Sequence, residues 1–310
     1  MTFNLLTRLS FRAFTLTLLV ASGLLASCSS STIYAPFKPT RIVVFGDSFS
    51  FASTTVAYTV NDSSTNNWAS QIAANYGVSS IVNNAAANAL LSAVQTQVNT
   101  FGSAYQAGDM VIINAGYRDI INDAAAGTNN ATSNGTAYAN LVRTMVANGA
   151  KHIAVANVYD LSKTPATLIG TTTATNLATQ NGNNRGLLVA AFNDALKSNL
   201  GSATLSYIGD NVRLVDTEGY LNLVRAAPNS YSFVDTTTVV CTLTGSTVGL
   251  GAGQVDSSQC AAANATGGTA LTYDTTNAYN NYVFADAVYP TPAFHRSWGT
   301  YAYNQLIARW

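Results

Sequence analysis

The sequence predicts an α/β protein in which a parallel sheet of five strands lies between two layers of helices. Short apolar runs of four or five residues alternate along the chain with longer amphipathic segments, and such runs fit buried strands of a parallel sheet. About 270 residues follow Thr40, which is enough for one large domain with a sizeable core. No internal repeat and no second domain is visible in the sequence.

The elements follow one another in a regular order. Strands are predicted over residues 41–45, 81–83, 110–114, 152–156 and 212–215. Helices are predicted over residues 68–76, 89–101, 136–148, 185–200 and 292–308. Gly77 and Gly149 end two of these helices, and Pro292 begins the last one. Residues 231–279 interrupt the alternation, and we expect them to form a surface excursion.

The first strand leads directly into Gly46-Asp47-Ser48-Phe49-Ser50. Ligands of open α/β sheets bind at the carboxyl ends of the strands, so the turn places the Ser48 hydroxyl where a nucleophile would stand. Near the end of the chain, Asp286-Ala287-Val288-Tyr289-Pro290-Thr291 forms a second candidate block.

Together the two blocks resemble the SGNH (GDSL-like) hydrolase family of lipases and esterases, over residues 41–310. The resemblance implies the flavodoxin-like strand order of that fold, and ester hydrolysis with Ser48 as nucleophile. Family members carry Asp-x-x-His-Pro-Thr in the last block, where the Asp orients the His and the His accepts the serine proton. Here Asp286 is kept and Tyr289 stands at the histidine position.

A tyrosine is a poor replacement for the histidine. A phenol with a pKa near 10 is protonated at pH 7, whereas imidazole, with a pKa near 6.5, can act as a general base. Two other histidines exist in the chain. His152 opens the fourth strand and is read as a surface or strand-edge residue. His295, in the last helix, is either a structural residue or a substitute base.

Two oxyanion positions of the family are also changed. The run that normally ends in Gly-Gly reads Asn84-Ala85-Ala86-Ala87-Asn88, so Asn88 replaces a glycine and offers a backbone N–H if its φ is compatible. In Gly116-Tyr117-Arg118-Asp119, Arg118 replaces the asparagine donor. Arg118 can pair with Asp47, Asp119 or Asp286, bind an anionic ligand, or donate to an oxyanion.

Two functions remain open, besides a purely structural role at the cell surface. The chain is either an ester hydrolase acting on a small-molecule ester, or a protein of weak or lost activity that binds a glycan or an anion in its cleft with Arg118 and Tyr289. Because three signature positions differ together, weak or lost hydrolysis is favoured. No phosphate-binding loop, dinucleotide motif or carboxylate pair suggests a cofactor or another chemistry.

The amino terminus has the layout of an export signal. Residues 1–27 contain Arg8, Arg12 and an apolar core too short to cross a bilayer stably. Leu25-Ala26-Ser27-Cys28 resembles the lipobox of bacterial lipoproteins, which implies lipidation of Cys28, a tether over residues 28–40 and a bacterial envelope location. Ser29 suggests the outer membrane by the same analogy. An ordinary signal peptidase site beside an incidental cysteine is the alternative.

Cysteine and charge content agree with export. Cys241 and Cys260 are the remaining thiols, and in an oxidising compartment we expect a disulfide between them. Their spacing from the histidines does not suggest a metal site. Charged residues make up 9% of the chain, against about 25% in average soluble proteins. Without Arg8 and Arg12 the chain has 12 basic and 14 acidic residues. Nucleic acid is therefore not an expected partner, and membrane contact is expected through the lipid anchor alone.

Overall fold

One parallel sheet organises the domain. The computed structural model describes residues 36–53, 56–62, 67–178, 186–201, 211–265, 278–307 and 310. The sheet order is β2-β1-β3-β4-β5, and every pair is parallel. The strands are β1 (Arg41–Phe45), β2 (Ile81–Asn83), β3 (Asp109–Asn114), β4 (Ile153–Ala156) and β5 (Val212–Val215). The predicted fold class and the strand order implied by the resemblance are confirmed.

The central strands are buried on both faces. Every residue of β3 and β4 is buried, as expected for apolar runs covered by helices on each side. The register pairs Phe45 with Ile113, Asn114 with Ala156, and Ala156 with Val215. The carboxyl ends of β1, β3, β4 and β5 therefore lie together at one edge of the sheet, where the predicted serine turn begins.

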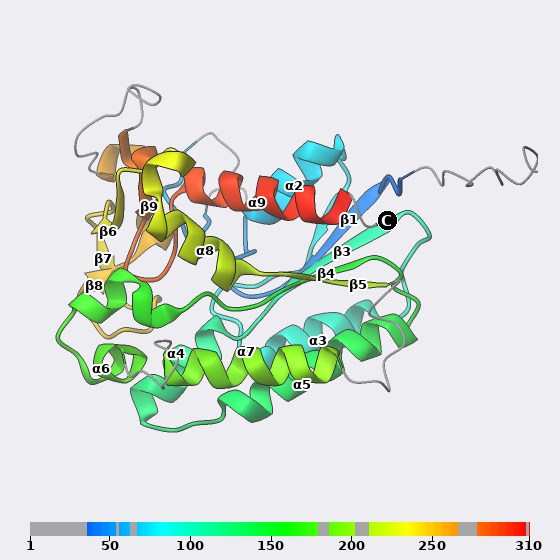
Figure 1. Ribbon diagram of the computed structural model, residues 1–310, viewed down its shortest axis with the longest axis horizontal. Coiled ribbons are helices and arrows are strands. Elements are labelled where there is room, and N and C mark those ends of the chain that lie inside the picture. Colours follow the sequence, from blue (N-terminus) through cyan, green and yellow to red (C-terminus); the bar gives the residue numbers. More distant parts are fainter. Residues whose placement is uncertain are drawn as a thin grey trace, which may run out of the picture. The chain divides into compact units, whose positions relative to one another are not determined.

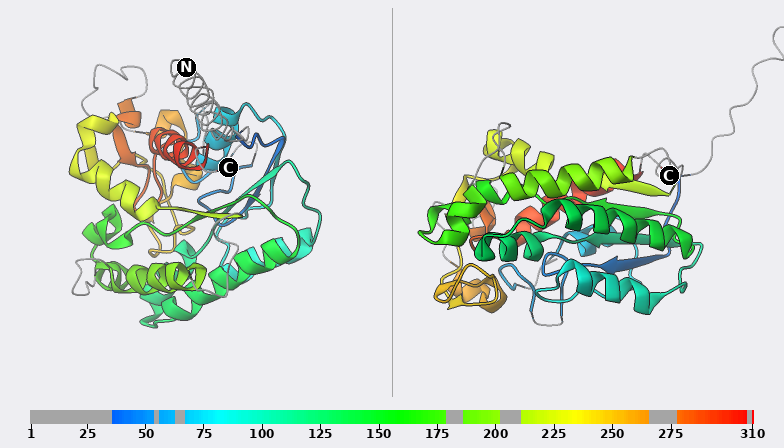
Figure 2. Two further views of the ribbon diagram at one scale, coloured as in Figure 1. Left: turned by 45° about the vertical axis from the view of Figure 1, so that its right-hand side comes forward. Right: turned by 90° about the horizontal axis from the view of Figure 1, so that it is seen from below.

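Helices cover both faces of the sheet (Figures 1 and 2). One layer contains α2 (Trp68–Tyr76), α8 (Thr217–Ala226) and α9 (Pro292–Ile307). The other contains α3 (Leu91–Phe101), α5 (Ala131–Ala147) and α7 (Leu187–Leu200), with α4 (Tyr117–Ala126) and α6 (Thr172–Ala178) beside them. Within the first layer, the indole rings of Trp68 and Trp298 stack with centroids 4.1 Å apart. Short 3₁₀ turns are η1 (Leu161–Lys163), η2 (Pro165–Leu168), η3 (Pro228–Tyr231), η4 (Ser257–Gln259), η5 (Ala262–Asn264) and η6 (Ala278–Asn281).

The predicted strands and five helices are present, with shifts at their ends. The largest shift is in α5, which begins at Ala131 and not at the predicted residue 136. Its first turns contain Thr, Ser, Asn and Gly, which are weak helix formers. Packing against α7 overrides this weakness. The backbones of the two helices lie so close at Gly135 that a Cβ there would be only 2.3 Å from the carbonyl oxygen of Phe192 in α7. The glycine thus allows the two helices to approach closely.

Two helices of about three turns were not predicted. The first, α4, begins directly after Gly116, whose φ of 107° favours glycine. The second, α8, is capped by Asp216, whose carboxylate accepts a hydrogen bond from Gly219 N at 3.2 Å. Only α8 therefore carries a side-chain cap that the sequence could signal, because the N-cap of α4 is Gly116 and makes no side-chain hydrogen bond.

Within residues 231–265, the segment contains regular structure that a surface excursion would lack. Its elements are β6 (Asp235–Val239), which pairs in parallel with β9 (Tyr282–Phe284), and a hairpin of β7 (Thr244–Gly245) with β8 (Gln254–Val255). Val248 and Leu250 are buried in the main core. The expectation of a surface excursion was therefore wrong for this part. The predicted disulfide between Cys241 and Cys260 is confirmed.

The two ends of the domain meet at the edge of the sheet opposite Ser48. Phe37 N donates to the Trp310 carbonyl at 2.8 Å, and the Phe37 ring stacks on His152 with centroids 3.5 Å apart. His152 directly precedes β4, so this cluster lies at the amino ends of the strands. The half-buried His152 is a strand-edge residue, as predicted.

Several sequence predictions fall outside the described residues. These are the signal segment 1–27, the lipobox with Cys28, Ser29, the first part of the tether and the predicted helix start at Arg185. Among the residues that the structure describes, no helix is both long and apolar enough to cross a membrane.

Candidate active site

The turn after β1 is fixed by glycine and glutamine. Gly46 N donates to Gln97 Oε1, and Gln97 Nε2 donates to the Gly46 carbonyl, both at 2.9 Å. A Cβ on Gly46 would lie 2.2 Å from Asn114 Oδ1, so no larger residue fits between β1 and β3. The turn therefore delivers Ser48 to the carboxyl edge of the sheet, where the sequence predicts it.

Asn88 lies beside the Ser48 hydroxyl. Its backbone N donates to Ser48 Oγ at 2.8 Å. The φ of Asn88 is 57°, in the left-handed region that the family glycine would occupy and that asparagine tolerates better than most residues. Its side-chain Nδ2 donates to the Tyr58 hydroxyl at 2.9 Å, which fixes the conformation. The substitution thus keeps a backbone donor in front of the serine.

Asp286 is bound by backbone amides. Its Oδ1 accepts from Val288 N at 2.8 Å and Tyr289 N at 2.6 Å, and its Oδ2 accepts from Ser257 N at 3.0 Å. Burial raises its pKa to about 6, against these hydrogen bonds, which favour the ionised form. The carboxylate therefore stabilises the turn that carries Tyr289.

Tyr289 lies beside the serine. The Ser48 hydroxyl is a hydrogen-bonding partner of the Tyr289 hydroxyl. Burial raises the pKa of Tyr289 well above its ordinary value, the charge of Asp47 adds to this, and the bond to Ser48 opposes it only partly. The Tyr289 ring packs on Tyr58 with centroids 4.9 Å apart. Ser48 thus faces a neutral phenol.

His295 is buried behind Phe49, with ring centroids 5.1 Å apart. Its ring bonds to the Tyr58 backbone, and Nδ1 has no partner. Burial lowers the pKa of His295 to about 3, so the ring is neutral at pH 7. Its contacts lie with Phe49 and Tyr58, the two neighbours of the site, rather than with Ser48 or Asp286.

Arg118 does not form the ion pair with Asp47, Asp119 or Asp286 that the sequence suggests. Its Nη1 donates to the Thr247 carbonyl at 3.3 Å. The carboxylates proposed as partners bind elsewhere: Asp119 Oδ2 accepts from Leu91 N, and Asp47 Oδ1 accepts from Phe49 N. Of the described residues, none forms an ion pair with Arg118, so the expected pairing was wrong. The long side chain turns toward the insertion.

Asp47 and three residues outside the family motifs complete the site. Burial raises the pKa of Asp47 to about 7, while Phe49 N and the Asn114 side-chain amide donate to its carboxylate. Tyr58, Asn114 and Ser257 were not singled out from the sequence. Tyr58 lies in a loop and Ser257 begins η4, both without a recognisable sequence pattern. Asn114 ends a predicted strand, where a polar residue could have signalled the site.

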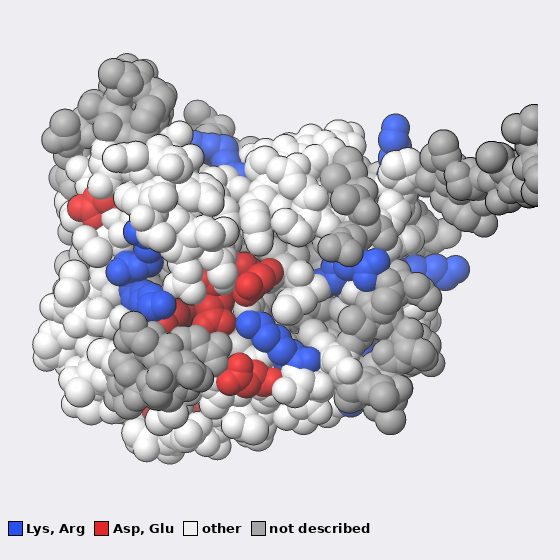
Figure 3. Space-filling model, in the orientation of Figure 1, with Lys and Arg blue, Asp and Glu red and all other residues white. Residues whose placement is uncertain are grey.

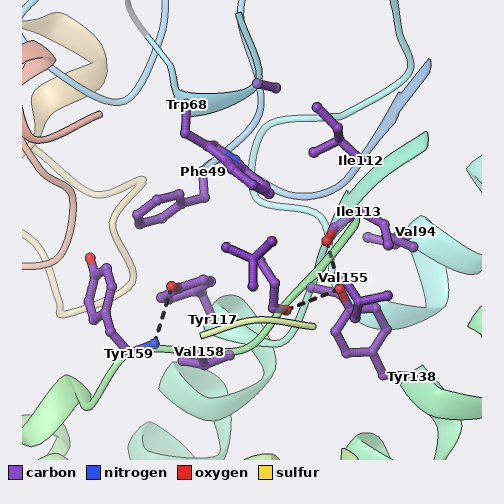
Figure 4. Close-up of a cluster of buried hydrophobic side chains, with 14 of the residues drawn as sticks. Phe49, Trp68, Val94, Ile112, Ile113, Tyr117, Tyr138, Val155, Val158 and Tyr159 are labelled. Atoms are coloured by element: carbon purple, nitrogen blue, oxygen red, sulfur yellow. Dashed lines mark hydrogen bonds between the residues drawn. The ribbon is translucent and has the colours of Figure 1, made fainter. Parts of the chain in front are cut away.

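An aromatic cluster supports the floor of the site (Figure 4). Phe49 stacks on Tyr117 with centroids 4.7 Å apart, and the Tyr117 hydroxyl accepts from Tyr159 N at 3.2 Å. The Tyr159 hydroxyl donates to the Val288 carbonyl. The cluster therefore connects the serine turn to the turn of Tyr289. In the described part of the chain, no group of three or more His, Cys, Asp or Glu side chains could hold a metal ion.

The chain matches a known protein family. The model of the family described as GDSL-like Lipase/Acylhydrolase matches residues 42–301. No curated protein matches the chain significantly. Solved structures with a similar fold include a member of the lipolytic protein G-D-S-L family from Veillonella parvula, with 12% identity, coverage of 87% of this chain and 99% of that chain, and a TM-score of 0.48. The M. smegmatis aryl esterase has 10% identity, coverage of 87% and 100%, and a TM-score of 0.44.

Proposed function

Because the chain belongs to the GDSL-like lipase/acylhydrolase family, we propose that Ser48 stands at the nucleophile position of an ester-hydrolase site whose hydrolytic activity is weak or lost. The observation that carries this proposal is the partner of the serine hydroxyl. It is the phenol of Tyr289, where the family motif has an imidazole.

The phenol cannot take the serine proton at neutral pH. Even an unperturbed tyrosine is ionised in only about one molecule in a thousand at pH 7, and burial raises the pKa of Tyr289 further. Loss of the triad base in subtilisin, an unrelated fold, lowers turnover by about 10⁶. A loss of similar order follows here if no other base reaches Ser48.

Stabilisation of an oxyanion is reduced in the same site. The amides of Ser48 and Asn88 remain as two donors. The third family donor is replaced by Arg118, whose Nη1 is engaged with the Thr247 carbonyl. Loss of one such donor costs about 10²–10³ in turnover.

His295 is the remaining candidate base in this region. Burial lowers its pKa to about 3, which makes it a much weaker base than ordinary imidazole. Its ring is also held by the Tyr58 backbone. A structural role for His295 is therefore the better supported of the two readings.

A second candidate function is binding without turnover. The observation that favours it concerns Arg118. Its guanidinium is permanently charged, and none of the described carboxylates forms an ion pair with it. An anionic or glycan ligand in the cleft could accept hydrogen bonds from this guanidinium. The face in Figure 3 carries only small, adjoining groups of basic and acidic residues, which gives no support to nucleic acid as a partner.

Hydrolysis of p-nitrophenyl butyrate by the full chain tests the first function. Ser48→Ala gives the background, and Tyr289→Phe keeps the ring while removing the hydroxyl. We expect the wild type to exceed Ser48→Ala only slightly, and Tyr289→Phe to equal the wild type. Strong turnover that Ser48→Ala abolishes would contradict the proposed impairment, and His295→Gln would then identify or exclude His295 as the base.

We also propose that the protein is a lipoprotein of the bacterial envelope, anchored through Cys28, with the outer membrane as its location. Support comes from the lipobox-like Leu25-Ala26-Ser27-Cys28 and from the disulfide, which is typical of an oxidising compartment. Globomycin should cause the precursor to accumulate. Normal processing in its presence would indicate an ordinary signal peptide.

A further inference from the structure

The site is closed to solvent. Ser48 is 2% exposed, Tyr289 1% and Asp286 0%. A nucleophile or a ligand-binding hydroxyl must be reached by its ligand, so the wall above Ser48 has to open. The element that forms this wall decides which ligands enter.

The connection between β7 and β8 carries two buried apolar side chains. Val248 and Leu250 are each 2% exposed and belong to the main hydrophobic core. Gly249 between them lies against α4, since a Cβ there would lie 1.9 Å from Arg118 Nη1 and 3.0 Å from Ile121 Cγ2. The connection thus packs on the helix that follows β3.

One buried carboxylate holds this connection in place. Asp256 Oδ2 accepts from Thr247 N at 3.1 Å and from Thr247 Oγ1 at 2.5 Å. Its Oδ1 accepts from Ser258 N at 3.1 Å and from Ser258 Oγ at 2.6 Å. Asp256 therefore joins the tip of the hairpin to the segment that follows it.

The following segment is attached to the site itself. Ser257 N donates to Asp286 Oδ2 at 3.0 Å. Asn61 Nδ2 donates to the Cys260 carbonyl at 2.9 Å, and Asn61 Oδ1 accepts from Ala57 N, next to Tyr58. This half of the disulfide loop is tied to the loops of both Tyr289 and Tyr58.

The connection between β7 and β8 contains glycines that can act as hinges, whereas residues 256–260 contain none. Gly249, Gly251 and Gly253 have φ values of 88°, 110° and 78°, a region where only glycine is unstrained. Gly251 and Gly253 have open space around them. The backbone on both sides of Leu250 can therefore rotate while residues 256–260 stay attached.

We propose that residues 244–255 are a lid over Ser48, latched by Thr247 and Arg118, and that the lid is the specificity-determining element of this site. The proposal rests on the position of Ser48 proposed above. Opening the lid moves Val248 and Leu250 away and breaks the contacts of Thr247 with Asp256 and Arg118. The Cys241–Cys260 disulfide limits this motion to the tip.

Access to position 48 can be measured without turnover. In the full chain carrying Ser48→Cys, alkylation by N-ethylmaleimide is followed by peptide mass analysis at position 48. The alkylation rate reports opening of the lid and does not depend on whether the protein hydrolyses esters. The chain offers a matched pair of latch variants. Thr247→Val removes the hydroxyl bond to Asp256, and Thr238→Val removes an equivalent 2.6 Å bond to Asp235 on β6.

We expect slow alkylation in the parent and in Thr238→Val, and a rate at least about tenfold higher in Thr247→Val, as expected for loss of a hydrogen bond to a charged group. Gly249→Ala, which forces the tip away from Arg118, should raise the rate as well. Circular dichroism confirms that each variant is folded. Equal rates in Thr247→Val and Thr238→Val, or a parent that reacts as fast as an exposed cysteine, would overturn the proposal.

Discussion

Tyr289→His tests the reasoning about the missing base most directly. Imidazole is shorter than the phenol, and the turn that holds residue 289 is fixed by Asp286 through backbone amides. Those bonds do not depend on the side chain. The introduced imidazole should therefore point at the Ser48 hydroxyl, and a rotation of the Ser48 side chain or a bridging water would complete the contact.

The size of the gain follows from what surrounds the new base. A positioned general base contributes about 10²–10⁴ in rate. Asp286 Oδ1 already accepts two amide bonds and Oδ2 accepts one, so little capacity remains to orient an imidazole. The third oxyanion donor is also missing. We therefore expect a rise of about 10² in kcat/KM, at the low end of that range.

The assay is p-nitrophenyl butyrate hydrolysis between pH 5 and 9, with Ser48→Ala in the same background as control. Activity of Tyr289→His should increase as the pH rises through the imidazole pKa, near 6.5 if it is unperturbed. Adding Arg118→Asn, which restores the third donor, should increase it further by about 10²–10³. No gain in either variant would refute the reasoning that the base is the principal deficit.

Three further outcomes concern stability. Replacing Cys241 and Cys260 by serine should lower the free energy of unfolding by about 3 kcal/mol in the chain-entropy model, measured by urea denaturation; an unchanged midpoint would show that the loop is already ordered without the bond. Burial raises the pKa of Asp47 to about 7 in the folded state, so folding favours the neutral carboxyl group. The stability that Asp47 contributes is therefore complete below about pH 4 and is lost as the pH rises through 7. Asp47→Asn should therefore gain in Tm relative to the wild type between pH 4 and pH 8, and a difference independent of pH would contradict this. Asn88→Ala should be less stable than Asn88→Gly by about 1–2 kcal/mol, because φ at this position is 57°; equal thermal stability of the two variants would argue against the left-handed conformation.

The sheet could be predicted because its central strands are short runs whose interior positions are apolar. The run from Met110 to Ile113 is buried at every position and can be read without knowledge of its neighbours. The start of α5 could not, since Gly135 is favourable there only because α7 passes within contact distance. A close approach of this kind is a property of the packed pair of helices.

The residues of the candidate site differ in the same way. Ser48, Asn88 and Tyr289 could be singled out from the sequence, because each follows a strand or belongs to a motif of fixed spacing, and in the structure they lie beside one another. The partner of Arg118 was not, because Thr247 lies in an insertion whose path depends on distant contacts. Ser257 escaped prediction for the same reason, although it binds Asp286 directly.

The contact between Phe37 and Trp310 keeps both of these residues away from Ser48. Both lie at the amino ends of the strands, beside His152, while Ser48 follows the carboxyl end of β1. A reporter or an immobilisation tag fused after Trp310 would therefore leave the domain at the edge of the sheet opposite Ser48.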